Sequence, residues 1–168
     1  TEIMNNTYHI LWIDDDCEIM SSFVKYCRFN HQIELTPYKT QKEGLDAFSQ
    51  NPSYWDGIIL DAKVLDESEN EAADIRSLYK AVARIQAEFK DVPFFISTGQ
   101  PDFMSAELFN AYCQSTSSGR YYKKVYEDKQ LCDDIKKAVD EKFQRQIKNK
   151  YSEIFSWLPA ELYGELLE

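Results

Sequence analysis

The chain has few residues of the kinds that bind zinc or form disulfide bridges. Its four cysteines are far apart, form no CxxC pair and are accompanied by only two histidines. Zinc sites and disulfide frameworks both depend on closely spaced ligands or paired cysteines. The sequence therefore predicts free thiols of the kind found in a reducing cytoplasm. The cysteines are Cys17, Cys27, Cys113 and Cys132.

Long apolar runs and an excess of basic charge are also missing. No apolar stretch approaches the length that crosses a bilayer, and residues 1–7 lack the basic and apolar regions of a secretion signal. We therefore expect a soluble cytoplasmic protein with no membrane partner. The 29 acidic residues exceed the 19 basic ones, which gives a formal net charge of -10. Because this charge repels a phosphate backbone, direct binding of nucleic acid is not expected.

The 168 residues, of which 43% are hydrophobic, are enough for one sizeable core but not for two. We expect one domain in residues 1–143. Residues 144–168 would form a helical extension or the start of a truncated downstream region. The first residue is not Met, which favours a piece excised from a longer protein.

Five short runs of apolar, β-branched and aromatic residues alternate with longer segments of helical period. This alternation is typical of an α/β protein with a doubly wound parallel sheet and helices on both faces. The first, third and fourth runs are almost continuously apolar, which predicts central strands. The runs are Tyr8–Ile13, Ile33–Tyr38, Trp55–Leu60, Pro93–Ser97 and Arg120–Lys123.

Helix starts can also be predicted. Ile19 belongs to the first helical stripe, together with Phe23 and Cys27, and Asp16 is the expected cap of that helix. Thr40 with Glu43 forms a capping box for the second helix. In the last helical segment, Asp128 is the expected cap, and the apolar stripe of that segment continues to Ile154.

Polar residues follow four of the five runs, where an open parallel sheet binds its ligands. They are Asp14–Asp16, Asp61, Thr98 and Lys123–Lys124. Carboxylates gathered at one edge repel one another and raise their own pKa values unless a cation neutralises them. Mg2+ suits this role because it prefers carboxylate oxygens and is often completed by phosphate.

This arrangement predicts phosphoryl transfer onto Asp61. An ionised carboxylate needs no general base to attack in line, and the product is an aspartyl phosphate. Lys124 and Mg2+ would neutralise charge, while Thr98 would donate a hydrogen bond to a phosphoryl oxygen. Each residue taken singly also has an ordinary interpretation, such as Thr98 in a turn. The occurrence of all of these residues at one edge of the sheet favours a phosphoryl-transfer site.

The pattern resembles the response-regulator receiver family of two-component signalling, over residues 8–143. The resemblance implies a CheY-like, flavodoxin-like sheet of order 2-1-3-4-5 with an extended C-terminal helical tail. It also implies self-phosphorylation and autodephosphorylation that depend on Mg2+, rather than turnover of a substrate. Asp14 and Asp15, after ILWI, would be the metal-binding pair, and Asp61, after GIIL, would be the phosphoacceptor and a further metal ligand.

The resemblance extends to the switch residues and the partners. Thr98 would be the switch hydroxyl, and Tyr121, three residues before Lys124, would be the switch aromatic. Lys63 stands where a backbone carbonyl usually completes the metal shell. A sensor histidine kinase or a phosphotransfer protein would donate the phosphoryl group. A homodimer would use the fourth helix, the fifth strand and the fifth helix.

Two loops depart from the family pattern. Val64–Leu65 replaces a common Met-Pro pair, and Val125 replaces a common proline. These departures leave a pseudo-receiver open, which would keep the fold and signal by protein contact without phosphorylation.

The other alternative is a haloacid-dehalogenase-like phosphatase. Asp14 and Asp16 match the Asp-x-Asp motif of such enzymes. This interpretation leaves Asp61 unexplained, and the later acidic pair is matched only by Asp133–Asp134, inside a helical stripe.

Overall fold

The computed structural model of the chain describes residues 7–63, 75–99 and 107–151. Within them lie five strands that pair in parallel, in the order β2-β1-β3-β4-β5. This topology confirms the predicted fold class and strand order. The strands are β1 (Tyr8–Ile13), β2 (Ile33–Tyr38), β3 (Gly57–Asp61), β4 (Phe94–Thr98) and β5 (Tyr121–Lys123).

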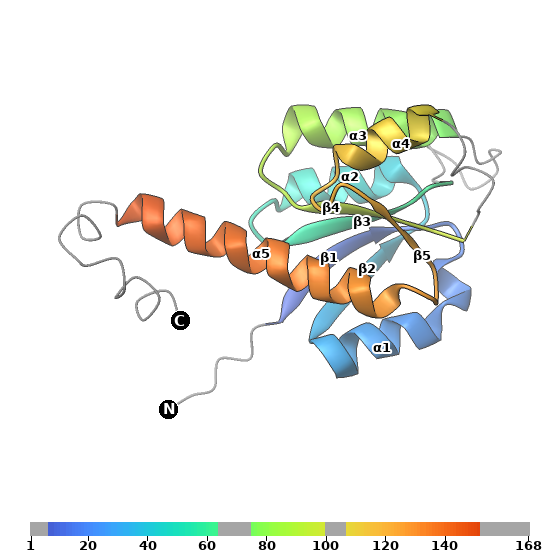
Figure 1. Ribbon diagram of the computed structural model, residues 1–168, viewed down its shortest axis with the longest axis horizontal. Helices are drawn as coiled ribbons and strands as arrows, with labels where there is room; N and C mark the ends of the chain where they lie inside the picture. Colours follow the sequence, from blue (N-terminus) through green and yellow to red (C-terminus); the bar gives the residue numbers. More distant parts are fainter. Residues whose placement is uncertain (1–6, 64–74, 100–106, 152–168) are drawn as a thin grey trace.

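Helices cover both faces of the sheet. Figure 1 shows α1 and α5 on one face, and α2, α3 and α4 on the other. The Glu43 amide donates to Thr40 Oγ1 at 3.2 Å, so the predicted cap of α2 is confirmed. The helices are α1 (Ser21–His31), α2 (Gln41–Gln50), α3 (Ile75–Glu88), α4 (Glu107–Gln114) and α5 (Asp128–Lys150), with a 3-10 helix, η1 (Cys17–Ile19), before α1.

The core has two apolar clusters, one on each face of the sheet. Leu11 and Ile13 of β1 belong to the cluster beneath α2 and α3, whereas Ile10 and Trp12 belong to the cluster beneath α1 and α5. Successive side chains of a strand point to opposite faces, so a central strand must be apolar at every position. This requirement explains the continuous apolar runs in the sequence and fixes β1 and β3 at the centre.

Two strands end one residue later than predicted. β3 includes Asp61, which lies opposite Ser97, and β4 includes Thr98, which lies opposite Lys123. From the sequence, these polar residues are expected after the strands, because the apolar runs stop before them. The parallel ladder of backbone hydrogen bonds does not depend on side-chain polarity, so it continues through both residues.

Three predictions at helix starts are wrong. α1 begins at Ser21, and Asp16 precedes η1 instead of capping α1. Ile19 lies in η1 and is 81% exposed, outside the buried stripe of α1. A 3-10 turn has three residues per turn, so the helical period cannot be extended back through it. Glu127, not Asp128, is the N-cap residue of α5.

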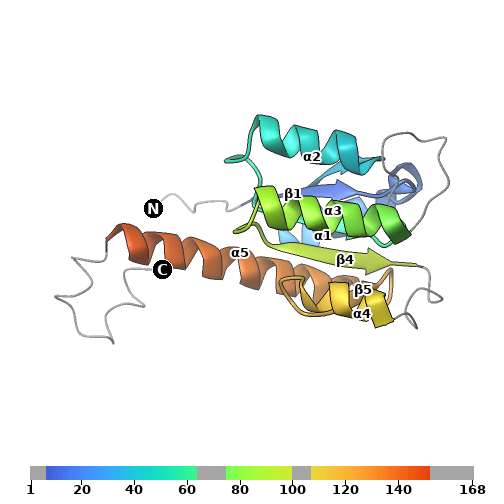
Figure 2. The same cartoon turned by 90° about the horizontal axis from the view of Figure 1, so that it is seen from above.

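α5 is the longest helix of the described residues. It continues without a break past residue 143, the predicted domain boundary, to Lys150. Its C-terminal half projects beyond the sheet in both views (Figures 1 and 2). Ile154 lies outside the described residues. Among the residues that are described, no helix combines the length and apolarity needed to cross a membrane.

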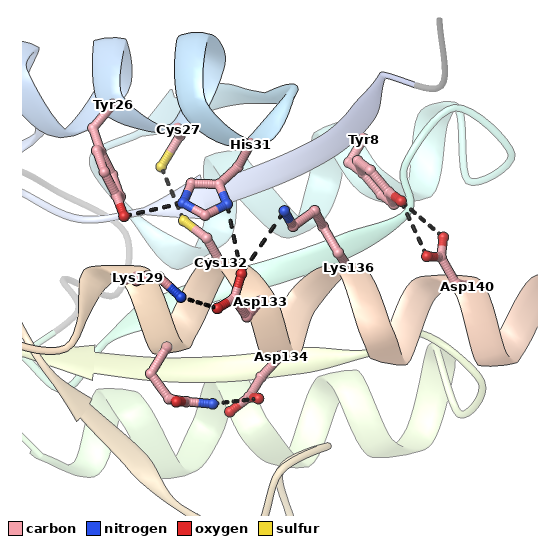
Figure 3. Close-up of polar contacts among 11 residues, drawn as sticks. Tyr8, Tyr26, Cys27, His31, Lys129, Cys132, Asp133, Asp134, Lys136 and Asp140 are labelled. Atoms are coloured by element: carbon pink, nitrogen blue, oxygen red, sulfur yellow. Dashed lines mark hydrogen bonds and ion pairs between the residues drawn. The ribbon is translucent and has the colours of Figure 1, made fainter. Parts of the chain in front are cut away.

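The seam between α1 and α5 holds a cluster of polar and sulfur contacts (Figure 3). The Sγ atoms of Cys27 and Cys132 are 3.7 Å apart and fully buried, and all four cysteines are free, as predicted. The hydrogen bond between the two thiols, followed by burial, raises the pKa of Cys27. His31 Nε2 is 3.0 Å from the Tyr26 hydroxyl. The Cys27–Cys132 contact joins α1 to α5, whereas the His31–Tyr26 contact lies within α1.

Candidate functional site

The predicted site residues lie at the carboxyl edge of the sheet. Asp14 follows β1, Asp61 ends β3 and Thr98 ends β4. Lys124 follows β5, and its amide donates to the Thr98 carbonyl at 3.0 Å. The Asp14 amide donates to the carbonyl of Tyr38, at the end of β2. Because backbone bonds hold each strand end to its neighbour, the side chains that follow the strands are brought together.

Lys124 is the link between the two buried carboxylates. Its Nζ is 2.7 Å from Asp14 Oδ2 and 3.4 Å from Asp61 Oδ1. The Asp14 side chain is fully buried, the Asp61 side chain is 5% exposed and the Lys124 side chain is 15% exposed. Lys123 is exposed, and its amide donates to Glu127 Oε2. The second lysine of the pair, and not the first, therefore faces the acidic residues.

The loop after β1 carries a graded acidic cluster. Asp14 is buried, Asp15 is half-buried and Asp16 is exposed, and one possible ligand atom from each lies within 4.8 Å of the others. The Asp16 amide donates to Asp14 Oδ1 at 2.9 Å. This bond turns the loop so that Asp14 Oδ2 remains directed at Lys124.

Burial sets the protonation of the site. It raises the pKa of Asp61 to about 7, with the charge of Asp14 adding to the rise and Lys124 opposing it. Burial also raises the pKa of Asp15, and Asp16 and Asp14 add to that rise. For Lys124, burial lowers the pKa, but attraction to Asp61 and Asp14 outweighs burial, so the pKa is raised. The site therefore has more carboxylate charge than its lysine can balance.

The donor set fits a hard divalent cation. Asp14 Oδ2 and Asp61 Oδ1 are buried carboxylate oxygens, and within the described residues the Lys124 ammonium contacts both of them. Mg2+ prefers carboxylate oxygens of this kind. Asp15 adds a further carboxylate next to Asp14, and the negative charge of such a group of carboxylates is what a divalent ion would neutralise. These residues are therefore suited to hold Mg2+.

Two further predicted residues lie near this edge. Lys63 lies in the turn after β3, two residues beyond Asp61, and is half-buried. Tyr121 begins β5 opposite Ile96 and packs, half-buried, against the apolar cluster beneath α2 and α3. The carbonyl ligand role of Lys63 and the switch role of Tyr121 stay predictions.

Asp133 and Asp134, the acidic pair that a phosphatase would require, make contacts away from the acidic cluster around Asp14. Asp133 pairs with Lys129 at 2.8 Å, and Asp134 accepts a hydrogen bond from the Tyr122 hydroxyl. Within the described residues, neither belongs to the acidic cluster around Asp14. The pair fixes α5 to its surroundings, so the geometry gives the phosphatase alternative no support.

The acidic residues that hold the Lys124 loop were not predicted from the sequence. Glu127 Oε2 accepts from the Lys123 amide at 2.7 Å, and Asp128 Oδ1 accepts from the Val125 amide at 3.0 Å. Val125 has a φ of 72°. A pair of acidic residues shortly after the lysine was the available signal, but only Asp128 was considered, and only as a helix cap.

Comparisons with known proteins identify the fold through structure alone. No protein-family model matches the sequence, and no curated protein matches it. A response regulator receiver domain from Clostridium thermocellum superposes with a TM-score of 0.60 at 23% identity, over 80% of this chain and 96% of that one. A CheY-like receiver domain from Methanospirillum hungatei gives a TM-score of 0.60 at 20% identity, over 82% and 97%.

A third similar structure contains a metal. It is a response regulator protein from Thermotoga maritima in complex with Mg(2+)-BeF, with a TM-score of 0.57 and 20% identity, over 79% of this chain and 99% of that one. All three matches cover nearly the whole length of the chain compared. Together with the parallel sheet of order β2-β1-β3-β4-β5, they show that this chain has the fold of the CheY-like response regulator receiver domains.

Proposed function

We propose that this chain is a phosphoacceptor receiver domain of a two-component response regulator, in which Asp61 takes up a phosphoryl group. The observation that carries the proposal is the placement of a buried Asp61 beside Asp14 and Lys124, at the carboxyl edge of a sheet with the receiver fold. Ligands bind at that edge in open parallel sheets. The Mg2+ complex of a similar response regulator is consistent with this site.

In the proposed reaction, a carboxylate oxygen of Asp61 attacks the phosphorus of the donor. The bond from phosphorus to the leaving group breaks, and the electron pair leaves with that group. Lys124 pairs with developing charge on the phosphoryl oxygens, and Thr98 donates a hydrogen bond to one of them. Asp14 and Asp15, with the Lys63 carbonyl, would hold Mg2+, which would supply positive charge at the phosphoryl group. Autodephosphorylation would reverse the modification by attack of water.

A histidine kinase or a phosphotransfer protein is the proposed donor in the cell. The fold is that of receiver domains, and the proposed site lies at the carboxyl edge of the sheet. Two hollows of the described surface lie at the opposite end of the sheet, against α5. A donor that presents its phosphoryl group on a protein surface fits an open edge of this kind.

The test is the intact mass of the protein after incubation with Mg2+ and acetyl phosphate or phosphoramidate. We expect the wild type to gain one phosphoryl group, and Asp61→Asn to gain none. Asp91→Asn is the matched control, because Asp91 is exposed and precedes β4 at the other end of the sheet. It should gain one phosphoryl group at the wild-type rate.

The other outcomes separate the alternatives. If the wild type takes up no phosphoryl group from any donor in the presence of Mg2+, the pseudo-receiver replaces this proposal. Release of inorganic phosphate that persists in Asp61→Asn and is lost in Asp14→Asn would instead establish a phosphatase.

We infer that phosphorylation also changes a surface. Thr98 would move towards the phosphoryl group, and Tyr121, now half-buried, would turn inward in the space that Thr98 leaves. α4, β5 and α5 would then repack, and a homodimer or another partner would bind this face. Amide spectra with and without phosphorylation should differ along α4 and β5. Spectra that coincide there would contradict the switch but not the acceptor role of Asp61.

A further inference from the structure

The loop that carries Lys124 contains an unusual backbone conformation. Val125 has a φ of 72° and is 78% exposed. The left-handed region is a genuine outlier for a β-branched residue, because its Cβ crowds the following carbonyl. The other non-glycine residue of the described chain with positive φ is Gln32, which ends α1 in a left-handed cap. Val125 ends no helix, so its conformation needs another source of stability.

Three consecutive amides of this loop have defined acceptors. The Lys123 amide donates to Glu127 Oε2 at 2.7 Å, and the Val125 amide donates to Asp128 Oδ1 at 3.0 Å. Between them, the Lys124 amide donates to the Thr98 carbonyl at 3.0 Å. The Lys124 backbone is therefore fixed on both sides by carboxylates from the start of α5.

Glu127 also holds the other end of β5. Its Oε1 pairs with the Arg120 guanidinium, and its amide donates to the Lys123 carbonyl at 2.9 Å. Glu127 thus stabilises the strand before Lys124, whereas Asp128 acts on the residue after it. The contact that coincides with the left-handed conformation is the one made by Asp128.

We propose that Asp128 is a positioning residue for Lys124. By accepting the Val125 amide, its carboxylate latches the loop in the left-handed turn, and this turn places the Lys124 ammonium beside Asp14 and Asp61. We call this hydrogen bond from the Val125 amide to Asp128 the latch. The latch is a property of the folded chain, whereas the contribution of Asp128 to phosphoryl transfer rests on the proposed function. A misplacement of about 1 Å at a reacting centre costs up to a hundredfold in rate, so a latch on the neighbouring residue matters for the chemistry.

A merely structural role for Asp128 must be separated from positioning. An acidic residue in the first turn of a helix is favourable through the helix dipole, whatever residue occupies position 125. The latch, by contrast, is needed only because valine resists positive φ. Glycine adopts that region freely, so Val125→Gly should remove the need for the latch. Asp128→Asn keeps an acceptor oxygen but loses the charge, whereas Asp128→Ala loses both.

The first measurement is hydrogen exchange of the Val125 amide in the whole chain. We expect Asp128→Ala to accelerate exchange at this amide at least tenfold, and Asp128→Asn to leave it within about threefold of the wild type. Glu141→Ala, which removes an exposed carboxylate elsewhere on α5, is the matched control and should have no effect. Equal protection of the Val125 amide in the wild type and Asp128→Ala would overturn the latch.

The second measurement is the rate of phosphoryl uptake at saturating Mg2+ and donor. We expect Asp128→Ala to lower the rate roughly tenfold, and Asp128→Asn to retain most of it. When Val125→Gly is also present, Asp128→Ala should cost no more than about twofold. The same loss with and without Val125→Gly would overturn the positioning role. If the wild type takes up no phosphoryl group, the proposed function fails, and the exchange measurement alone decides the latch.

Discussion

Asp61→Asn is expected to stabilise the metal-free protein at pH 8, by about 2 kcal/mol. The wild-type carboxyl is buried beside Asp14, and burial raises its pKa from 3.8 to about 7. The folded state therefore holds this proton more tightly than the unfolded state does. As the pH rises above 4, ionisation costs stability until the pH passes 7, and the loss is then constant. Asparagine has no charge to bury, so it avoids this loss.

The magnitude follows from the size of the shift. One pKa unit corresponds to about 1.4 kcal/mol, so the full shift sets an upper limit of about 4 kcal/mol. Relaxation of the site on ionisation reduces that figure, which gives the value of about 2 kcal/mol.

The measurement is urea unfolding in the presence of EDTA, at pH 8 and at pH 5. The advantage of Asp61→Asn should be largest at pH 8 and fall to less than about half of that value at pH 5, where the wild-type carboxyl is mostly protonated. Mg2+ should stabilise the wild type more than the variant. Asp91→Asn, at an exposed position, should match the wild type at both pH values. A wild type that is the more stable of the two at pH 8 without Mg2+ would contradict the account.

The sheet could be predicted because its signals are local and redundant. Ile10 and Trp12 face one cluster while Leu11 and Ile13 face the other, so the sequence of β1 had to be apolar throughout. The rule that ligands bind at the carboxyl ends of parallel strands then placed the polar residues after each run at one edge. The parallel order of the strands was therefore enough to predict that these polar residues lie close together.

The loops could not be predicted in the same way. The start of α1 depends on η1, whose 3-10 period breaks the apolar spacing that Ile19 had suggested. The conformation of Val125 depends on a side chain three residues later, that of Asp128. The spacing of apolar residues along the sequence does not predict such a contact. Valine is also a residue for which positive φ would not be expected. The raised pKa of Asp61 likewise depends on its burial and on the charges of Asp14 and Lys124, which follow other strands of the sheet.

Lys124→Met is expected to lower the rate of phosphoryl uptake by about a hundredfold or more. The ammonium lies within 3.4 Å of both buried carboxylates and is the cation that the described site offers to a phosphoryl oxygen. Loss of one preorganised donor to developing negative charge typically costs a hundredfold to a thousandfold in rate. Methionine keeps an unbranched apolar stem of similar length, so the change removes mainly the charge.

The same variant should be less stable at high pH, by about 2 kcal/mol at pH 8. Lys124 lowers the pKa of Asp61, so its removal raises that pKa further and makes ionisation of the folded state more costly. The loss should shrink as the pH falls towards 5, because the carboxyls then bind protons. Adding Asp61→Asn to Lys124→Met should restore stability at pH 8, and by more than the same change gives in the wild type.

Lys123→Met is the matched control for both measurements, because Lys123 is the adjacent lysine, is exposed and uses its backbone amide for its contact with Glu127. It should keep wild-type uptake of the phosphoryl group and wild-type stability at pH 8. If Lys123→Met loses as much activity as Lys124→Met, a general loss of positive charge explains the result. If only Lys124→Met is impaired and its loss of stability grows with pH, the ammonium acts through Asp14 and Asp61, as their distances indicate.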